Sequence, residues 1–157
     1  MNSTKNILLT LLVATVSLTA CDEARIFEEN IDIPENQWDQ KNKIKFDVQI
    51  NENKIPYNFY INLRHAGDYP YNNLFMFLTT KTPGGKISTD TLECVLAKPD
   101  GDWLGDGSGD IFDHQILFKK NVQFPEKGLY HFELEQAMRI KKLPLVMDVG
   151  IRVEKSI

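Results

Sequence analysis

Long apolar runs and an excess of basic residues are both missing from this sequence of 157 residues. No run approaches the roughly 20 apolar residues that a membrane-spanning helix needs. Lys and Arg number 18 against 22 Asp and Glu, so the formal net charge of −4 leaves no surplus of cations to neutralise phosphates. We therefore expect neither a membrane-spanning helix nor nucleic-acid binding.

Groups typical of catalytic and metal centres are also sparse. The three histidines, His65, His114 and His131, lie far apart along the chain, and none has a second histidine or a cysteine at metal-ligand spacing. Ser108 lies between glycines, but a nucleophile elbow needs glycine two residues to each side of the serine. We therefore predict no catalytic residue, no metal ligand and no cofactor, and we do not expect an enzyme.

Residues 100–110 form an acidic, glycine-rich segment that partly resembles a calcium-binding loop. Asp106, Ser108 and Asp110 alternate as the first ligands of such a loop do. The loop also needs glycine at its sixth position and glutamate at its twelfth, where this sequence has Ile111 and Leu117. We favour a turn between strands, in which the glycines supply positive φ angles. A looser calcium site remains an alternative, with oxygens from Asp102, Asp106, Asp110 or Asp113.

The first 20 residues are typical of a signal peptide. Lys5 is followed by a mostly apolar stretch over residues 7–18, which is too short to span a membrane as a stable helix. The tetrapeptide Leu18-Thr19-Ala20-Cys21 resembles the lipobox of bacterial lipoproteins, in which the cysteine thiol is acylated and the peptide is cut just before it. We predict lipidation at Cys21; the alternative is an ordinary signal peptide followed by a chance cysteine.

Cysteine usage agrees with an anchor at Cys21. The only other cysteine is Cys94, so lipidation of Cys21 excludes an intramolecular disulfide. Cys94 lies in the alternating run Leu92, Cys94, Leu96, which predicts a small buried core residue rather than a reactive thiol.

Acidic residues are concentrated just after the expected cleavage point. Residues 21–40 hold seven Asp and Glu against one Arg, which predicts a lipidated cysteine followed by an acidic tether. Asp22-Glu23 is a partial match to the surface-export signal of Bacteroidetes lipoproteins, and a solvated linker is the alternative. Apolar residues in the segment leave room for a first strand near residues 27–33. The folded domain is expected over residues 41–157.

Period-two alternation of apolar and polar residues recurs through residues 41–157 and predicts strands. Alternating runs lie at 44–50, 57–63, 92–96, 130–134 and 147–153, while 74–80 reads as a fully buried strand and 116–118 as a short apolar run. Seven or eight strands with one apolar face each must bury those faces on another sheet. The predicted fold is all-β, a two-sheet antiparallel β-sandwich of jelly-roll or immunoglobulin-like type, with a closed β-barrel as the alternative.

Four residues are candidates for contact with a partner. Arg64 precedes an aromatic loop that contains Tyr69 and Tyr71, and exposed tyrosine and arginine favour protein or sugar contact. Trp103 lies in the acidic segment and could stack on a sugar ring. The alternative is that the tyrosines fold over the edge of the sandwich and that the Trp103 segment is a simple turn.

Several sequence blocks occur together in a particular order. After the lipobox come Trp38, then Arg64, followed by residues 69–75, 90–93, 103–105, 128–130, 136–139 and 148–154. In this order the blocks resemble the GldH family of gliding-motility lipoproteins from Bacteroidetes. The resemblance implies a cell-envelope lipoprotein needed by gliding machinery that is linked to type IX secretion, with no catalytic residue and no cofactor.

The sequence therefore predicts a non-catalytic component or assembly factor of the envelope machinery for gliding motility and type IX secretion. A lipid on Cys21 would hold it in the cell envelope, with the outer membrane expected, and other gliding or secretion proteins would be its partners. A surface carbohydrate-binding module is the alternative function. A carrier of a small ligand is a third reading, which would need a barrel with a large apolar cavity.

Overall fold

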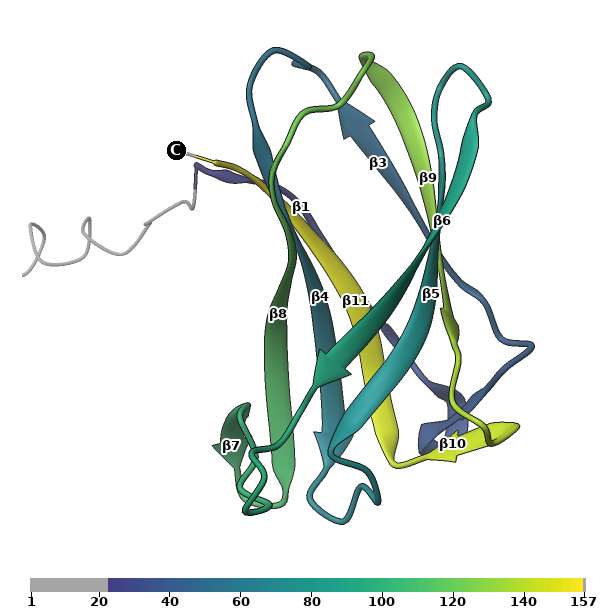
Figure 1. Cartoon of the computed structure of the whole chain (residues 1–157), viewed down its shortest axis with the longest axis vertical. Coiled ribbons are helices and arrows are strands. Elements are labelled where there is room, and N and C mark those ends of the chain that lie inside the picture. The colour runs from purple at the N-terminus through teal and green to yellow at the C-terminus, as the bar shows by residue number, and fades with distance from the viewer. Residues whose placement is uncertain (1–22, 157) are drawn as a thin grey trace, which may run out of the picture.

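Strands make up most of the chain in the computed structural model, which describes residues 23–156 (Figure 1). The long strands are β1 (Arg25–Asp32), β3 (Ile44–Ile50), β4 (Tyr57–Ala66), β5 (Asn73–Lys81), β6 (Ile87–Val95), β8 (Ile111–Val122), β9 (Gly128–Gln136) and β11 (Val146–Lys155). Shorter elements are a 3-10 turn, η1 (Pro34–Asn36), and the strands β2 (Gln37–Asp39), β7 (Asp106–Ser108) and β10 (Lys142–Pro144). Within residues 23–156, no helix is long and apolar enough to cross a bilayer.

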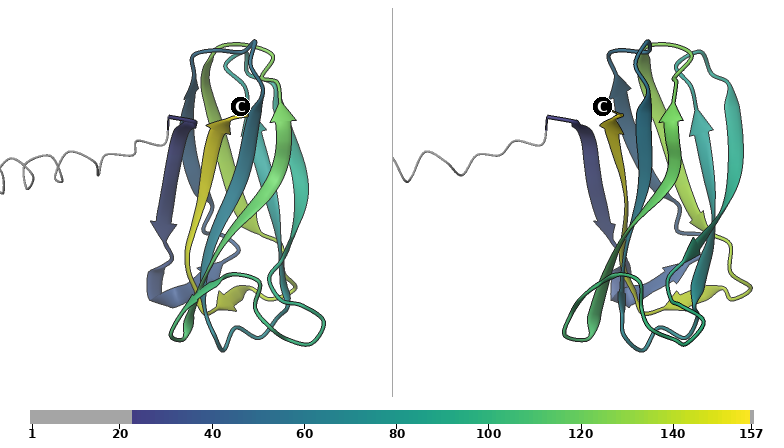
Figure 2. Two further views of the ribbon diagram at one scale, coloured as in Figure 1. Left: turned by 90° about the vertical axis from the view of Figure 1, so that its left-hand side faces the viewer. Right: turned by 60° about the vertical axis from the view of Figure 1, so that its left-hand side comes forward.

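Most of the strands form two facing sheets (Figure 2), and β2 and β10 pair with each other in a separate two-stranded sheet. One sheet has the order β1-β11-β4-β8-β7 and the other has the order β3-β9-β5-β6, with every neighbouring pair antiparallel. If the eight long strands are numbered 1 to 8 along the chain, one sheet has the order 1-8-3-6 and the other has the order 2-7-4-5. This is the strand order of a jelly roll. The predicted sandwich is confirmed as a jelly roll rather than an immunoglobulin-like fold. Neither sheet closes on itself within the described residues, so the closed-barrel alternative is wrong.

The inner faces of the two sheets share one hydrophobic core. Along β3 the side chains alternate strictly between buried and exposed, as the period-two pattern predicts. Phe59 of β4 and Phe132 of β9 meet across the sheets with ring centroids 5.0 Å apart. Each fully buried side chain of this kind contributes about 1.5–3 kcal/mol. Burial of these faces is therefore the main force that holds the sheets together.

Two strands differ from their sequence-based predictions. β5 is not fully buried, because Phe75 and Phe77 are 36% and 39% exposed on the outer face of the four-stranded sheet. β8 begins at Ile111, well before the short apolar run at 116–118, since it pairs with β4 from Ala66 back to Tyr57. A central strand can carry polar residues on its outer face, and these hid the length of β8 from a search for apolar runs.

The acidic segment is more ordered than a tether. Its residues 25–32 form β1, which pairs with β11 at the edge of the five-stranded sheet. Trp38 is completely buried, and its indole Nε1 donates a hydrogen bond to the carbonyl of Asn42 at 2.8 Å. Residues 25–39 therefore pack on the sandwich, although Cys21 and the signal peptide lie outside the described residues.

Cys94 lies in the core, as the sequence predicts, and Tyr130 lies there too. Cys94 is 1% exposed, and burial raises the pKa of its thiol to about 12, which keeps the thiol protonated and unreactive. Tyr130 is buried at the start of β9, and its hydroxyl donates to the carbonyl of Glu126 at 2.8 Å. This bond back to the preceding turn is the arrangement of a tyrosine corner.

Replacement of Trp38 tests whether the acidic segment belongs to the fold. Trp38→Ala removes a buried ring and a hydrogen bond, so we expect the free energy of unfolding to fall by about 3–5 kcal/mol. Ile87→Ala is the control, because Ile87 is 63% exposed and a change of about 0.5 kcal/mol or less is expected. Urea denaturation measures both; equal effects would mean that the segment is only a tether.

Candidate functional site

A line of charged side chains crosses the outer face of the five-stranded sheet near one end. Residues that pair directly in an antiparallel sheet point to the same face, and the register of the sheet joins one residue from each strand. We call this line the aspartate row; in order of the strands β1-β11-β4-β8-β7, its members are Asp32, Asp148, Arg64, Asp113 and Asp106.

Arg64 lies at the centre of the aspartate row and contacts a carboxylate on each side. Its Nε donates to Asp113 Oδ1 at 2.6 Å, and its Nη1 lies 3.2 Å from Asp148 Oδ2. Burial raises the pKa of Asp148, which is 5% exposed, while Arg64 lowers it and Asp113 and Asp32 raise it further. One cation among four aspartates leaves the row with a formal charge of −3.

The neighbouring line of side chains on the same face is made of amides. Asn62 Nδ2 donates to Asn30 Oδ1 at 3.0 Å, and Gln115 Nε2 donates to Asn62 Oδ1 at 3.2 Å. Gly150 lies between Asn30 and Asn62 in the register, and a Cβ atom there would collide with the Asn30 side chain and the backbone of Glu29. The missing side chain therefore allows the amides to meet across β11.

A hollow of about 170 Å³ opens between the aspartate row and the amides. Its lining includes Asp106, Asp113 and Asp148 from the row and Asn30, Asn62 and Gln115 from the amides, together with Leu63 and His114. We call it the polar hollow. It is a place on this sheet face where a polar group of a partner could be enclosed.

Beneath the row, inside the sandwich, two histidines from β4 and β8 form a buried pair. His65 is fully buried and His114 is 6% exposed, and their Nε2 atoms are 2.9 Å apart. His65 Nδ1 lies 2.8 Å from the carbonyl of Ala66, which can only accept a hydrogen bond. In the neutral pair, His65 therefore carries its hydrogen on Nδ1, and His114 Nε2 must donate to His65 Nε2.

This order of donors leaves His114 Nδ1 as a bare acceptor. Burial and the proximity of His65 lower the pKa of His114 to about 4, and burial lowers the pKa of His65, so both rings are neutral at pH 7. No described residue donates to His114 Nδ1. Within residues 23–156, every side-chain nitrogen or oxygen that is inaccessible to solvent has a hydrogen-bond partner. Because His114 Nδ1 has no such partner, it is accessible at a surface. The polar hollow is one of the spaces that His114 lines.

The aromatic candidates from the sequence gather around His65. The ring centroids of Trp103 and Tyr69 lie 4.4 Å and 5.2 Å from that of His65, and Tyr71 packs on Tyr69 at 5.7 Å. Tyr69 is only 4% exposed, and its hydroxyl donates to the carbonyl of Asn73 at 3.1 Å. The expectation of an exposed Tyr69 is thus wrong, because its ring is enclosed.

Trp103 and Tyr71 are half-buried, so only part of each ring is open to solvent. Trp103 also pairs with Ala97 in an isolated bridge that closes the loop before β7. These aromatic side chains hold the loops at this end of the sandwich together. Arg64 is the candidate that lies on the polar sheet face instead, and contact of all four with a partner stays a prediction.

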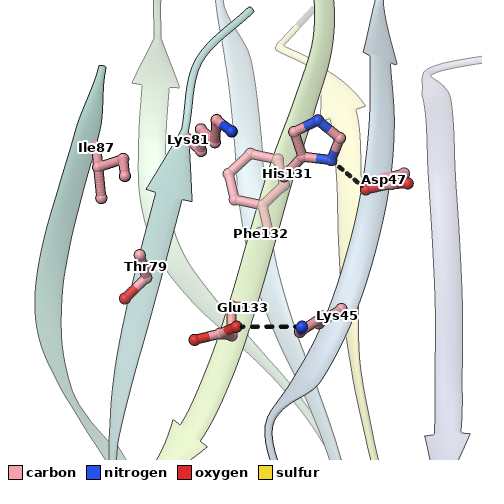
Figure 3. Close-up of a pocket in the computed structure, with 8 residues that line it drawn as sticks. All are labelled: Lys45, Asp47, Thr79, Lys81, Ile87, His131, Phe132 and Glu133. Atoms are coloured by element: carbon pink, nitrogen blue, oxygen red, sulfur yellow. Dashed lines mark hydrogen bonds and ion pairs between the residues drawn. The ribbon is translucent and has the colours of Figure 1, made fainter. Parts of the chain in front are cut away.

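The opposite sheet has a larger but electrically balanced hollow of about 440 Å³ (Figure 3). His131 Nδ1 lies 2.6 Å from Asp47 Oδ1, and Lys45 Nζ lies 3.8 Å from Glu133 Oε2 (Figure 3). Lys81 and the exposed Ile87 complete the far wall. Because positive and negative groups alternate here, this surface selects neither sign of partner.

Metal binding finds no support in the described residues. Within residues 23–156, no group of three or more His, Cys, Asp or Glu side chains is placed to hold a metal ion. Asp106 and Asp113 do lie opposite each other, but in a line across the sheet rather than around one point. The looser calcium site therefore stays an untested alternative.

Sequence reasoning missed Asp32, Asp148 and the histidine pair. Asp148 is one of the polar residues that alternate with apolar ones along β11, so nothing in the strand itself marked it, and its neighbours Arg64 and Asp32 are more than 80 residues away in the chain. His65 and His114 are 49 residues apart and meet only because β4 pairs with β8.

The fold and the site define a jelly-roll protein with ordered charged and amide side chains on one outer sheet face. The model of the GldH lipoprotein family matches residues 25–153. The chain belongs to this family, which confirms the resemblance seen in the sequence.

Two curated relatives resemble the chain over most of its length. A protein of Christiangramia forsetii named gliding motility lipoprotein GldH homolog is 37% identical over 148 residues, 90% of each chain. The gliding motility lipoprotein GldH of Flavobacterium johnsoniae is 35% identical over 153 residues, 93% of this chain and 94% of that protein. The alignment with a solved structure of TmCBM61 in complex with β-1,4-galactotriose covers 82% of this chain and 81% of that chain. At 10% identity and a TM-score of 0.29, this likeness is too weak to support a conclusion.

Acidification is expected to destabilise the protein through the histidine pair. The unfolded chain takes up protons near pH 6.5, whereas His114 in the folded protein has a pKa of about 4, so the unfolded state binds more protons between these values. Stability should be fully retained above pH 6.5 and should fall toward pH 4, by up to about 1.4 kcal/mol per pH unit for each proton. Urea denaturation at a series of pH values measures this.

His114→Gln is the comparison for this experiment, because glutamine does not titrate. Its stability should change less between pH 6.5 and 4. The lowered pKa values of Glu28 and Glu154 cause a further loss in both proteins below about pH 4.5. The same slope in both proteins above pH 4.5 would show that the histidine pair is not the source.

Proposed function

We propose that this chain is a lipid-anchored lipoprotein of the cell envelope that serves gliding motility as a non-catalytic subunit or assembly factor. The family match over residues 25–153, together with relatives named for gliding motility, is the observation that carries the proposal. The lipobox ending at Cys21 supplies the means of anchoring. The proposal also includes a link to type IX secretion and a location in the outer membrane.

The arrangement of the fold supports contact with a partner at a distance from the anchor. Arg25 at the start of β1 pairs with Glu154 near the end of β11, at the end of the sandwich where Figure 1 marks the C-terminus. The aspartate row lies toward the opposite end, because Asp32 is the last residue of β1. Cys21 precedes Arg25 by four residues, which span at most about 14 Å. A lipid there would hold the first end close to the bilayer and present the row away from it.

Lipidation also makes weak protein contacts effective. Confinement to a membrane raises the local concentration of partners in the same envelope layer, so a modest contact suffices for assembly. Two or more acyl chains on one cysteine would make the attachment effectively permanent, since each buried methylene contributes about 0.8 kcal/mol.

The anchor is tested by a crosslinking pull-down from intact cells with wild type and Cys21→Ala in parallel. We expect the wild type to fractionate with membranes and to capture gliding or secretion proteins, and Cys21→Ala to lose both. Cys94→Ala is the matched control, since it removes the buried thiol and leaves the lipobox intact. Membrane retention of Cys21→Ala would refute the anchor, and a wild type that captures no envelope protein would refute the subunit role.

The link to motility and secretion is tested by deletion of the gene in a gliding host. We expect slower spreading and less adhesin on the cell surface, both restored by the wild-type chain and not by Cys21→Ala. Normal adhesin export together with lost spreading would separate the protein from type IX secretion. Normal values for both would count against the whole proposal.

A further inference from the structure

We propose that the aspartate row is the docking surface for a basic segment of a protein partner, whose Lys and Arg side chains lie along the row and enter the polar hollow. This inference rests on the proposed role in protein contact and names the chemistry of the partner. The proposal follows from the charge of the row, from the line in which the charges lie, and from unpartnered acceptor atoms on side chains that line the hollow.

The charge of the aspartate row is only partly neutralised within the protein. Arg64 pairs with Asp113 and Asp148, but Asp32 and Asp106 at the two ends of the row form no ion pair with a described residue. Asp106 also lies directly opposite Asp113, and like charges in that position destabilise a sheet. A cationic partner would remove this repulsion, which gives the site a preference for one sign of charge.

The geometry favours an extended partner over a single ion. Neighbouring strands are about 4.8 Å apart, so the four gaps from Asp32 to Asp106 span about 19 Å. Within the described residues the acidic side chains do not surround one point at which a metal ion could sit. A peptide segment with several basic side chains can follow such a line, whereas one divalent ion can neutralise only a part of it.

The polar hollow provides acceptors for a donor-only group. Asp148 Oδ2 contacts Arg64, while Asp148 Oδ1 has no described partner although the side chain is almost completely buried. His114 also lines the hollow, and its Nδ1 is a second bare acceptor, fixed in that state by the hydrogen bonds of His65. Lysine ammonium and arginine guanidinium groups carry donors and no acceptor. A volume of about 170 Å³ accommodates the end of one such side chain.

Position makes the row accessible to such a partner. It lies on an outer sheet face and toward the end of the sandwich opposite to Arg25, from which the chain leads back to Cys21. The side chains of Arg64 and Asp113 are 43% and 48% exposed, so both are open to a partner, while Asp148 beside Arg64 is almost completely buried.

A peptide-binding measurement tests the proposal on the lipidated mature protein in zwitterionic detergent. The probe is a fluorescent octapeptide of alternating Lys and Thr, and the control peptide has Glu in place of Lys. We expect saturable binding of the Lys peptide at low ionic strength, weaker binding as salt is added, and no binding of the Glu peptide. Failure of the Lys peptide to bind, or equal binding of both peptides, would overturn the proposal.

Asp32→Asn and Asp106→Asn are the informative variants, because neither residue forms an ion pair that the fold uses. Each should weaken binding of the Lys peptide about threefold to tenfold, and the two effects should multiply in the double variant because the sites are far apart. Asp100→Asn is the matched control: it removes one charge from an exposed loop and keeps an acceptor for the backbone N–H of Asp102. A change below about twofold is expected there.

Three further outcomes decide the matter. An equal loss of affinity in Asp100→Asn would show attraction to overall charge and would remove the row as the site. Saturable binding of Ca²⁺ alone, lost in Asp106→Asn, would replace the basic segment with a single cation. Row variants that lose peptide binding while they stay in the membrane fraction would support the row independently of the anchor. If the wild type captures no envelope protein in the crosslinking pull-down, that result counts against the proposed function and not against the aspartate row as a docking surface.

Discussion

The pairing of β4 with β8 on one side and β11 on the other is the constraint on which the rest of the structure depends. On the inner face it aligns Ile61 and Leu63 with the core of the sandwich, where both are almost completely buried. On the outer face the same register sets Arg64 between two aspartates. A shift of one residue would turn every side chain of β4 to the wrong face, so the core and the charged face are specified together.

The alternation of apolar residues was enough to predict the strands but not their order. Strands such as β3 and β9 could be read directly, because each has one apolar and one polar face. The choice among sandwich types depends on contacts between strands far apart in the chain, such as β1 with β11, and no local pattern encodes these. The same reason explains why Arg64 was recognised as a candidate while its partner Asp148 was not.

The aromatic loop shows the limit of reading function from residue type. Tyrosine and tryptophan are common in binding sites, but they also enclose loops at the ends of sandwiches. Tyr69 and Trp103 surround a buried imidazole, and that packing accounts for Tyr69 without any partner. The charged residues on strands proved the more distinctive surface, since an ordered sheet fixes the spacing of side chains far better than a loop does.

The orientation of the histidine pair affects which hydrogen-bonding groups, donors or acceptors, line the neighbouring polar hollow. The carbonyl of Ala66 orients the hydrogen of His65, which orients that of His114, so the bond dipoles point head to tail and end in a lone pair. Reversal would require both rings to change tautomer at once and would leave two acceptors facing each other at Ala66. A backbone carbonyl two rings away thus keeps a hydrogen-bond acceptor, and not a donor, on the outermost nitrogen of a side chain that lines the hollow.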